Sequence, residues 1–583
     1  MKAKVKANIR PELSPGRFKF LVWLLSFIFI VLVAKAASIQ VISPDKLRHE
    51  SDIRSVRTNE LEVQRGLITD RYNDMLAVSV PMLALVADPQ LIAQNDGFAD
   101  VNRWQALAEV IGVPYAKIKH RIESNPKLRW LYLKRQLTPG VANYIRQLKL
   151  PGLLLSEESR RYYPAGETIA QLIGITNIDD QGIEGIERAY DQWLTGTSDK
   201  VDIRRNNTGE VVEILSEIKS GKPSKDLNLS IDLRIQSLAY QELKNATANL
   251  NATSASLVVL DVKTGEILAM ANTPSFNPNV TSQRQPFRVR NRAISDTFEP
   301  GSTVKPFVIA AALEAGVLKP EEVIATSPGY MRLGGSYVRD GRDLGDLTVQ
   351  QVLLKSSNVG TSKIAQRMPA QEILGTYYAL GLGSFSGLQL NGEQDGLINE
   401  RYRWSDFEKA TLSFGYGFTV TTLQMARMYS VLANEGKMMP VTILKRAKVD
   451  GEVQLPEATQ VLSKEVADKV LKMLVGITKP GGTALKAHIE GYPVAGKTGT
   501  SEKAVAGGYG NDYVASFVGV APAHDPKLVI AVMINEPKGD DYHGGDAAAP
   551  VFAKVMAGAL QMLNVEPVIE QQLQFVNLQE RVR

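Results

Sequence analysis

The sequence predicts a mixed α/β fold of the α+β type for most of the chain: one antiparallel sheet covered by helices, with a helical insertion beside it. Apolar strand patterns lie near both ends of the region 226–565. The portion between them, from Ser302 to about Met439, is mostly helical in its periodicity, with glycine-rich breaks. A long apolar run near the N-terminus predicts one transmembrane helix ahead of this fold.

That apolar run defines the first two segments of the chain. Six Lys or Arg residues and one Glu lie in residues 1–19, and they account for the whole formal net charge of +5. With Lys35 reaching the lipid head groups, Phe18 to Ile39 is long enough to span a bilayer. The basic excess predicts a cytoplasmic tail, residues 1–17, and a body outside the cytoplasm. A cleaved signal ending near Ala34-Lys35-Ala36 is the alternative, and it exports the body equally.

Composition excludes several classes of function. The chain has 583 residues, which predicts at least two domains, and it has no cysteine. Disulfides, thiolate metal sites, iron–sulfur clusters and thiol nucleophiles are therefore excluded. The five histidines show no metal-ligand spacing, so we expect no metal and no cofactor. Beyond residue 19 the chain is formally neutral, and nothing in that balance suggests a nucleic-acid partner.

Residues 40–225 are expected to form an N-terminal domain outside the cytoplasm. A strand signal followed by a polar turn covers 65–73, and helical periodicity appears near Trp104 to Ile111 and Pro139 to Leu148. No catalytic pattern occurs here, so we interpret the region as a spacer or docking domain. A cluster of Ser, Gly, Lys and Pro at 219–225 marks its end.

The region 226–565 carries the predicted sheet, and residues 566–583 form a C-terminal tail. A hairpin is expected from 257–262 and 266–271, two further strands from 512–520 and 527–534, and a helix from 547–563. A cleft between the sheet and the helical insertion is the natural place for a site.

The strongest local signal for chemistry is Glu299-Pro300-Gly301-Ser302-Thr303-Val304-Lys305-Pro306. Pro306 fits a helix only near its start, so Ser302 must lie at or near the helix N-terminus, with Lys305 on the same face. Burial and the positive helix end both lower a lysine pKa, so a neutral Lys305 can accept the proton of the Ser302 hydroxyl. By itself, however, a Ser-x-x-Lys tetrapeptide is common in capped helices with an exposed lysine.

Two further segments strengthen this interpretation. Ser356-Ser357-Asn358 offers a hydroxyl to relay a proton and an amide to hold a substrate carbonyl. Lys497-Thr498-Gly499-Thr500 offers a cation and hydroxyls for a carboxylate, and a glycine that lets a substrate backbone lie close. Either alone could be a surface segment. The three in this order are the signature of penicillin-binding proteins and serine β-lactamases.

One rival motif overlaps the last segment. Residues 491–498 match the phosphate-binding pattern Gly-x4-Gly-Lys-Thr. That loop requires a strand before it and a helix after it, whereas 501–511 is polar and glycine-rich. A domain outside the cytoplasm also lacks a nucleotide supply, so we disfavour this alternative.

Over nearly its whole length the sequence resembles the class B penicillin-binding proteins, and among them the division-specific transpeptidases of Gram-negative bacteria. Besides the three segments above, the resemblance is carried by Arg65–Arg71, Arg161–Gly166 and Gly182–Glu187. It implies the penicillin-binding transpeptidase fold, preceded by an elongated periplasmic domain. It also implies a peptidoglycan D,D-transpeptidase that forms septal cross-links and is a β-lactam target.

By this resemblance, Ser302 attacks the penultimate D-alanine of a stem peptide and Lys305 is the general base. Ser356 and Lys497 carry a proton to the leaving amine, and Asn358 holds a substrate carbonyl. Thr498 and Thr500 contact the substrate carboxylate beside Gly499.

The same resemblance implies partners and alternatives. The partners are a septal glycosyltransferase of the shape, elongation, division and sporulation family, and other divisome proteins. The alternatives are an elongation-specific transpeptidase that governs cell shape, a D,D-carboxypeptidase, a β-lactamase, or a divisome scaffold whose catalysis is secondary.

Overall fold

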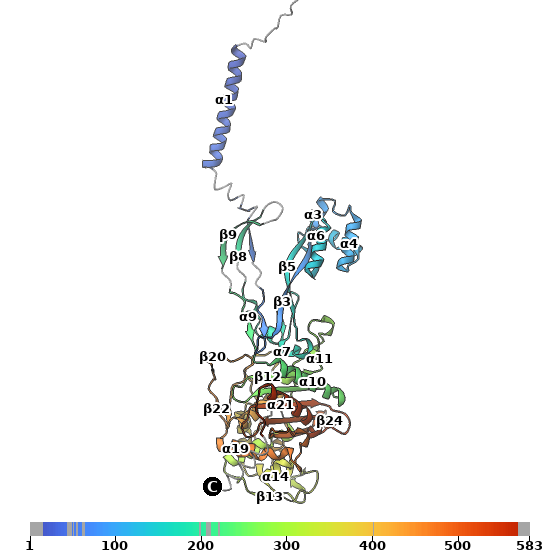
Figure 1. Ribbon diagram of the computed structural model, residues 1–583, viewed down its shortest axis with the longest axis vertical. Coiled ribbons are helices and arrows are strands. Elements are labelled where there is room, and N and C mark those ends of the chain that lie inside the picture. Colours follow the sequence, from blue (N-terminus) through green and yellow to red (C-terminus); the bar gives the residue numbers. More distant parts are fainter. Residues whose placement is uncertain are drawn as a thin grey trace, which may run out of the picture. The chain divides into compact units, whose positions relative to one another are not determined.

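The computed structural model describes residues 15–42, 49, 52–53, 56–60, 64–197, 200–205, 211–219, 222–399, 401–505 and 507–568 (Figure 1). Contacts divide the chain into two units, one made of Met1–Val63 with Gly196–Pro223 and the other of Gln64–Thr195 with Ser224–Arg583. The predicted tails lie largely outside the described residues, at 1–14 and 569–583.

The first unit contains the predicted apolar helix. Helix α1 covers Pro15–Ala37, with Pro15 at its start, where a missing N–H costs no hydrogen bond, and η1 extends it over Ser38–Ile42. The stretch Pro15–Gln40 is long enough to cross a membrane, and its most apolar 18-residue window has a mean hydropathy of 2.5, so it fits a single-pass anchor. The unit also holds an antiparallel sheet of β1 (Val56–Glu60), β8 (Lys200–Arg205) and β9 (Val211–Lys219).

The second unit begins with a small α+β region. Strand β3 (Met75–Ala87) pairs with β4 (Leu131–Leu137) and β5 (Leu153–Tyr162). Its core surrounds the fully buried Trp104. The expected strand near 65–73 is present as β2 (Ile68–Thr69), and the two predicted helices are α4 (Val101–Ile111) and α6 (Pro139–Gln147).

One buried ion cluster joins the three segments that carry the family resemblance outside the site. The Glu187 carboxylate accepts hydrogen bonds from Arg65 Nε and Arg161 Nε, each at 2.7 Å. All three side chains are almost fully buried. Removing one charge would leave the others uncompensated inside the protein, so the cluster requires all three segments.

The larger sheet has five strands, and every neighbouring pair is antiparallel. Its order is β12 (Ile267–Thr273), β11 (Ser254–Asp261), β25 (Leu528–Asn535), β24 (Gly508–Ala521) and β23 (Ala495–Val505). The predicted hairpin and the two C-terminal strands are thereby confirmed. Helices α10 (Leu233–Asn249) and α21 (Ala549–Met562) cover one face, and α18 (Thr422–Ala433) covers the other.

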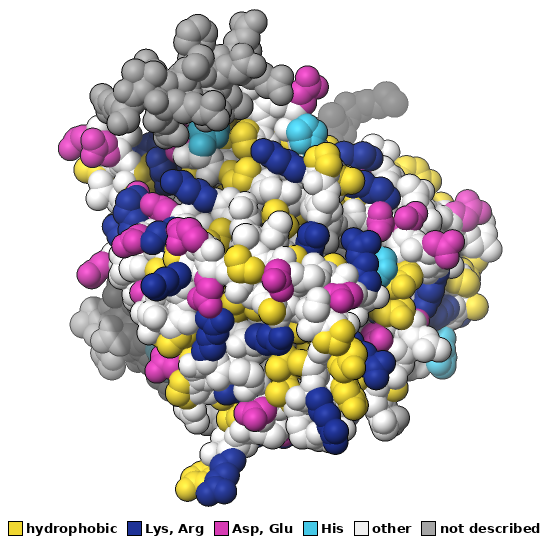
Figure 2. Space-filling model, turned by 90° about the horizontal axis from the view of Figure 1, so that it is seen from below, with side chains coloured by type: hydrophobic (Ala, Val, Ile, Leu, Met, Phe, Trp, Pro, Cys, Tyr) yellow, Lys and Arg dark blue, Asp and Glu magenta, His cyan; other side chains and the backbone are white. Residues whose placement is uncertain are grey.

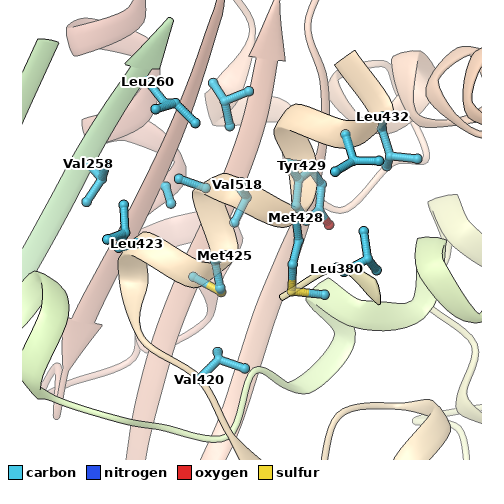
Figure 3. Packing of buried hydrophobic residues seen from close by; sticks show 14 of the residues in the cluster. Val258, Leu260, Leu380, Val420, Leu423, Met425, Met428, Tyr429, Leu432 and Val518 are labelled. Carbon is cyan, nitrogen blue, oxygen red and sulfur yellow. The ribbon is translucent and has the colours of Figure 1, made fainter. Parts of the chain in front are cut away.

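Alternation along the strands separates the two hydrophobic layers. Leu257 and Val259 pack toward α10 and α21, whereas Val258 and Leu260 pack toward α18. Figure 3 shows the second layer, in which side chains of α18 lie over the sheet. Because α18 is buried along its whole length, it acts as a central core helix rather than as a surface helix.

The insertion differs from its prediction in one respect. It is mostly helical, as expected, with α13 (Lys305–Glu314), α15 (Asn358–Ala365) and other helices. It also contains short strand pairs, among them the hairpin of β14 (Tyr330–Leu333) and β15 (Ser336–Arg339). Strands of two to four residues are too short to show an alternation that competes with helical periodicity.

The surface of the protein mixes charges. Figure 2 shows Lys and Arg side chains interspersed with Asp and Glu over one face, together with scattered hydrophobic side chains. Such a mixture is typical of a surface that stays in contact with water.

Candidate active site

Ser302 lies where an extended segment turns into a helix. Residues Gly301–Val304 form a 3-10 turn, η4, and α13 follows directly from Lys305, with Pro306 in its first turn. The predicted position at a helix start is confirmed, with the difference that Ser302 belongs to the 3-10 turn before the α-helix. Ser302 remains partly exposed, whereas Gly301, Thr303 and Val304 are buried.

Close backbone contacts hold this turn in place. Gly301, at φ 54°, donates its N–H to the Gly415 carbonyl at 3.0 Å. Gly415 itself has a φ of 89°, and a Cβ on it would overlap the Gly301 carbonyl. The Tyr429 hydroxyl of α18 donates to the Thr303 carbonyl at 2.7 Å. The core helix therefore positions the turn that carries Ser302.

The Lys305 amine connects the first segment to the second. Its Nζ donates to the Ser356 carbonyl at 2.6 Å, to Asn358 Oδ1 at 2.7 Å and to Ser356 Oγ at 3.3 Å. Ser356 adopts φ 56°, a strained conformation for a non-glycine residue that is common at functional sites. Among the described residues, the Ser302 hydroxyl makes no hydrogen bond. In unliganded sites the contact between nucleophile and base often tightens only when substrate binds.

The Lys497 amine connects the third segment to the second. Lys497 lies on the edge strand β23, and its Nζ donates to Ser356 Oγ at 2.9 Å. The Ser356 hydroxyl thus accepts from both lysines. The strand runs on to Val505, so no helix follows Lys497, and the phosphate-binding alternative is excluded.

The segment Lys497–Thr500 packs closely against the turn that carries Ser302 because Gly499 has no side chain. A Cβ on Gly499 would lie 2.8 Å from the Pro300 carbonyl oxygen and 2.9 Å from the Thr303 side chain. The Thr500 hydroxyl accepts the N–H of Gly544 at 3.0 Å, and Thr498 Oγ1 lies 3.0 Å from Thr483 Oγ1. All the predicted site segments, from Ser302 to Thr500, are therefore brought together.

Burial disfavours the charged form of both lysines and so lowers their pKa values. Burial lowers the pKa of Lys305 to about 7, an effect that the Asp340 carboxylate opposes. The pKa of Lys497 is lowered well below its ordinary value, first by burial and then by the positive charge of Lys305. Two ammonium groups sharing one hydroxyl repel each other, so the pair favours at least one neutral amine at neutral pH.

The lowered pKa of Lys305 predicts how the rate of Ser302 acylation depends on pH. A neutral Lys305 can act as a base, so acylation of Ser302 should be slow below pH 7 and should rise to a plateau above it. The measurement is the second-order rate constant for penicillin acylation between pH 5 and 9, within the range of stability of the protein. A rate that falls as the pH rises through this range would contradict the assignment.

Asp340 is a residue of the site that the sequence did not indicate. Its Oδ1 accepts the backbone N–H of Asn358 at 2.6 Å and of Val359 at 3.1 Å, and its Oδ2 accepts the Ser357 hydroxyl at 2.6 Å. One carboxylate thereby caps the start of α15 and holds the segment from Ser356 to Asn358. Asp340 is a single acid in a polar turn, sixteen residues before Ser356, and nothing in the residues around it indicates this role.

Replacing Asp340 by Asn should therefore affect both geometry and charge. Loss of the charged acceptor should displace Ser356 and Asn358 and slow penicillin acylation by about 10²-fold. Because Asp340 raises the pKa of Lys305, its loss should also shift the midpoint of the pH profile below 7. Asp346→Asn, at an exposed acid on β16 (Asp346–Thr348), is the control and should leave the midpoint in place. An unshifted midpoint in Asp340→Asn would contradict the electrostatic role.

Comparison with known proteins agrees with this geometry. Residues 255–557 match the family model of the penicillin binding protein transpeptidase domain, and residues 60–229 match that of the penicillin-binding protein dimerisation domain. The chain is 45% identical to the peptidoglycan D,D-transpeptidase FtsI of Escherichia coli over 97% of its own length and 96% of that protein. A crystal structure of penicillin binding protein 3 from Mycobacterium tuberculosis, complexed with aztreonam, aligns at a TM-score of 0.66 and 28% identity over 88% of this chain and 98% of that one.

The fold and the three converging segments define a serine-type penicillin-binding transpeptidase domain. The chain belongs to the class B penicillin-binding proteins, as a relative of the FtsI proteins.

Proposed function

We propose that the protein is a peptidoglycan D,D-transpeptidase that cross-links stem peptides of the septal cell wall through a serine acyl-enzyme. The observation that carries this proposal is the chain of contacts from Lys305 through Ser356 to Lys497, beside an accessible Ser302. Its relatives among the FtsI proteins are named as peptidoglycan D,D-transpeptidases, which supports the same activity.

The acylation step assigns a role to each group. Ser302 Oγ attacks the carbonyl of the penultimate D-alanine and gives its proton to the neutral Lys305 amine. The bond to the last D-alanine breaks, and its amine leaves after receiving a proton by way of Ser356 and Lys497. Asn358 holds a substrate carbonyl, while Thr498 and Thr500, beside Gly499, contact the terminal carboxylate. No metal or cofactor takes part in this scheme.

The second step completes the cross-link. An amine of a neighbouring stem peptide attacks the ester carbonyl, loses a proton and forms an amide, and Ser302 recovers its hydroxyl hydrogen. β-Lactams resemble the D-Ala-D-Ala end and should acylate Ser302 in the same way.

The chain divides functionally in our proposal into a cytoplasmic tail (1–17), an inner-membrane anchor (18–39), a periplasmic interaction domain (40–225), the transpeptidase domain (226–565) and a tail (566–583). The basic residues ahead of the anchor support a cytoplasmic N-terminus. We infer a location at the division septum, with a glycosyltransferase of the shape, elongation, division and sporulation family and other divisome proteins as partners.

Intact-mass measurement after incubation with penicillin tests the chemistry. The full-length protein should gain one penicillin, and Ser302→Ala should gain none. No adduct on the parent protein, or an adduct on Ser302→Ala, would overturn the proposal. A rapidly lost adduct would indicate a β-lactamase, and release of D-alanine without cross-linked product would indicate a carboxypeptidase.

Depletion of the protein in cells tests the division role. Filaments would support septal synthesis, and rounded cells would indicate an elongation enzyme. Normal septation with Ser302→Ala as the only copy would indicate a scaffold.

A further inference from the structure

The hairpin β14–β15 borders a pocket next to the Ser356–Asn358 segment. It has a volume of about 430 Å³ and is lined by Tyr330, Tyr337, Arg339, Asp340, Arg342 and Asp343. Asn358 Nδ2 donates to the Arg339 carbonyl at 3.1 Å, and its backbone N–H donates to Asp340. The pocket is therefore connected by direct hydrogen bonds to the residue proposed to hold a substrate carbonyl.

In this pocket the arginine side chains are free to bind a ligand, whereas the aspartate side chains are already hydrogen-bonded within the protein. Asp340 is occupied by α15, and Asp343 Oδ1 accepts the Ser327 hydroxyl and the Gly345 N–H, each at 2.9 Å. Arg339 and Arg342 are exposed, and within the part of the chain that the structure describes neither forms an ion pair. The carboxylates of Asp340 and Asp343 thus accept hydrogen bonds from the protein, whereas the guanidinium groups of Arg339 and Arg342 are available to bind an anion.

Two tyrosines supply a flat wall beside these cations. Tyr330 and Tyr337 are 50% and 45% exposed, and their rings meet edge to face at 5.9 Å. The Arg339 guanidinium lies over the Tyr337 ring at 5.5 Å, which orients it without neutralising it. Fixed rings and cations of this kind suit an extended peptide that carries carboxylates.

We propose that this pocket binds a free carboxylate of the donor stem peptide, upstream of its D-Ala-D-Ala end, through Arg339 and Arg342. The inference rests on the proposed transpeptidase function and adds a specificity site to it. Stem peptides contain a glutamate linked through its side chain, so its α-carboxylate is free for such a contact. A small β-lactam lacks this part of the peptide and does not need the pocket.

Two synthetic stem pentapeptides test the proposal on the full-length protein in detergent. They end in D-Ala-D-Ala and differ only in the glutamate α-carboxylate, which is free in one and amidated in the other. Each competes with a fluorescent penicillin for Ser302, and the half-protecting concentration is measured. The parent protein should prefer the free carboxylate by about 10-fold.

Variants assign that preference to the pocket. The double variant Arg339→Ala with Arg342→Ala should lose it, while its acylation by penicillin stays within about 2-fold of the parent. Arg332→Ala, at an exposed arginine of β14 that does not line the pocket, should keep it. A parent protein without the preference, a preference that survives in the double variant, or an equal loss for both peptides would overturn the inference. A parent protein that penicillin does not acylate would instead overturn the proposed function.

Discussion

Replacing Lys305 by Arg should lower the second-order rate constant for penicillin acylation by about 10³-fold. The Lys305 amine is completely buried, and its pKa of about 7 lets it be neutral at physiological pH. A guanidinium keeps its proton in proteins and cannot accept one from Ser302. The variant therefore retains a cation at this position and loses the base.

The rate is measured by intact mass or by a fluorescent penicillin at pH 8, where the parent amine is neutral. Lys355→Arg is the matched control because Lys355 is exposed and adjoins Ser356, and its rate should stay within about 2-fold of the parent. Lys305→Ala should lose as much as Lys305→Arg, which separates loss of the base from the size of the new side chain. A loss below 10-fold in both variants would remove Lys305 from the role of base.

Replacing Gly415 by Ala should damage both stability and acylation. Gly415 has a φ of 89°, which an alanine adopts with strain, and the new methyl group would overlap the Gly301 carbonyl. Strain and overpacking together should lower the free energy of unfolding by about 3 kcal/mol. Because Gly301 begins the turn that carries Ser302, the displaced turn should also slow acylation by about 10²-fold.

Gly417→Ala separates the two causes. Gly417 has a similar φ of 83°, but no atom lies near the position of a new Cβ. It should show only the strain, about 1 kcal/mol, with little change in acylation. The measurements are the shift in denaturation midpoint and the acylation rate. Equal effects of the two substitutions would mean that the overlap with Gly301 does not matter.

Patterns that depend on neighbouring residues were predictable. Short apolar runs next to turn residues predicted β11, β12, β24 and β25, and Pro306 predicted that Ser302 begins a helix. The edge strand β23 was not predicted, because its polar, glycine-rich sequence shows little apolar pattern. The short hairpins of the insertion were missed because strands of two to four residues are too short to show a pattern.

The roles of glycines and of Asp340 could not be predicted from local patterns. Gly415 matters because the Gly301 carbonyl, more than 100 residues earlier, lies against it. Asp340 matters because its carboxylate meets the start of α15, although it lies in a turn after β15. Neither contact can be predicted from the residues adjacent to Gly415 or Asp340 in the sequence.

The sequence by itself determined which chemical groups the protein carries and in which order, because a nucleophile, two lysines and a glycine are recognisable from a few adjacent residues. Only the tertiary structure decided that one hydroxyl, that of Ser356, receives both amines, across separations of 51 and 141 residues. The packing of α18 against the five-stranded sheet brings these distant residues together. The burial that results lowers the pKa values of Lys305 and Lys497.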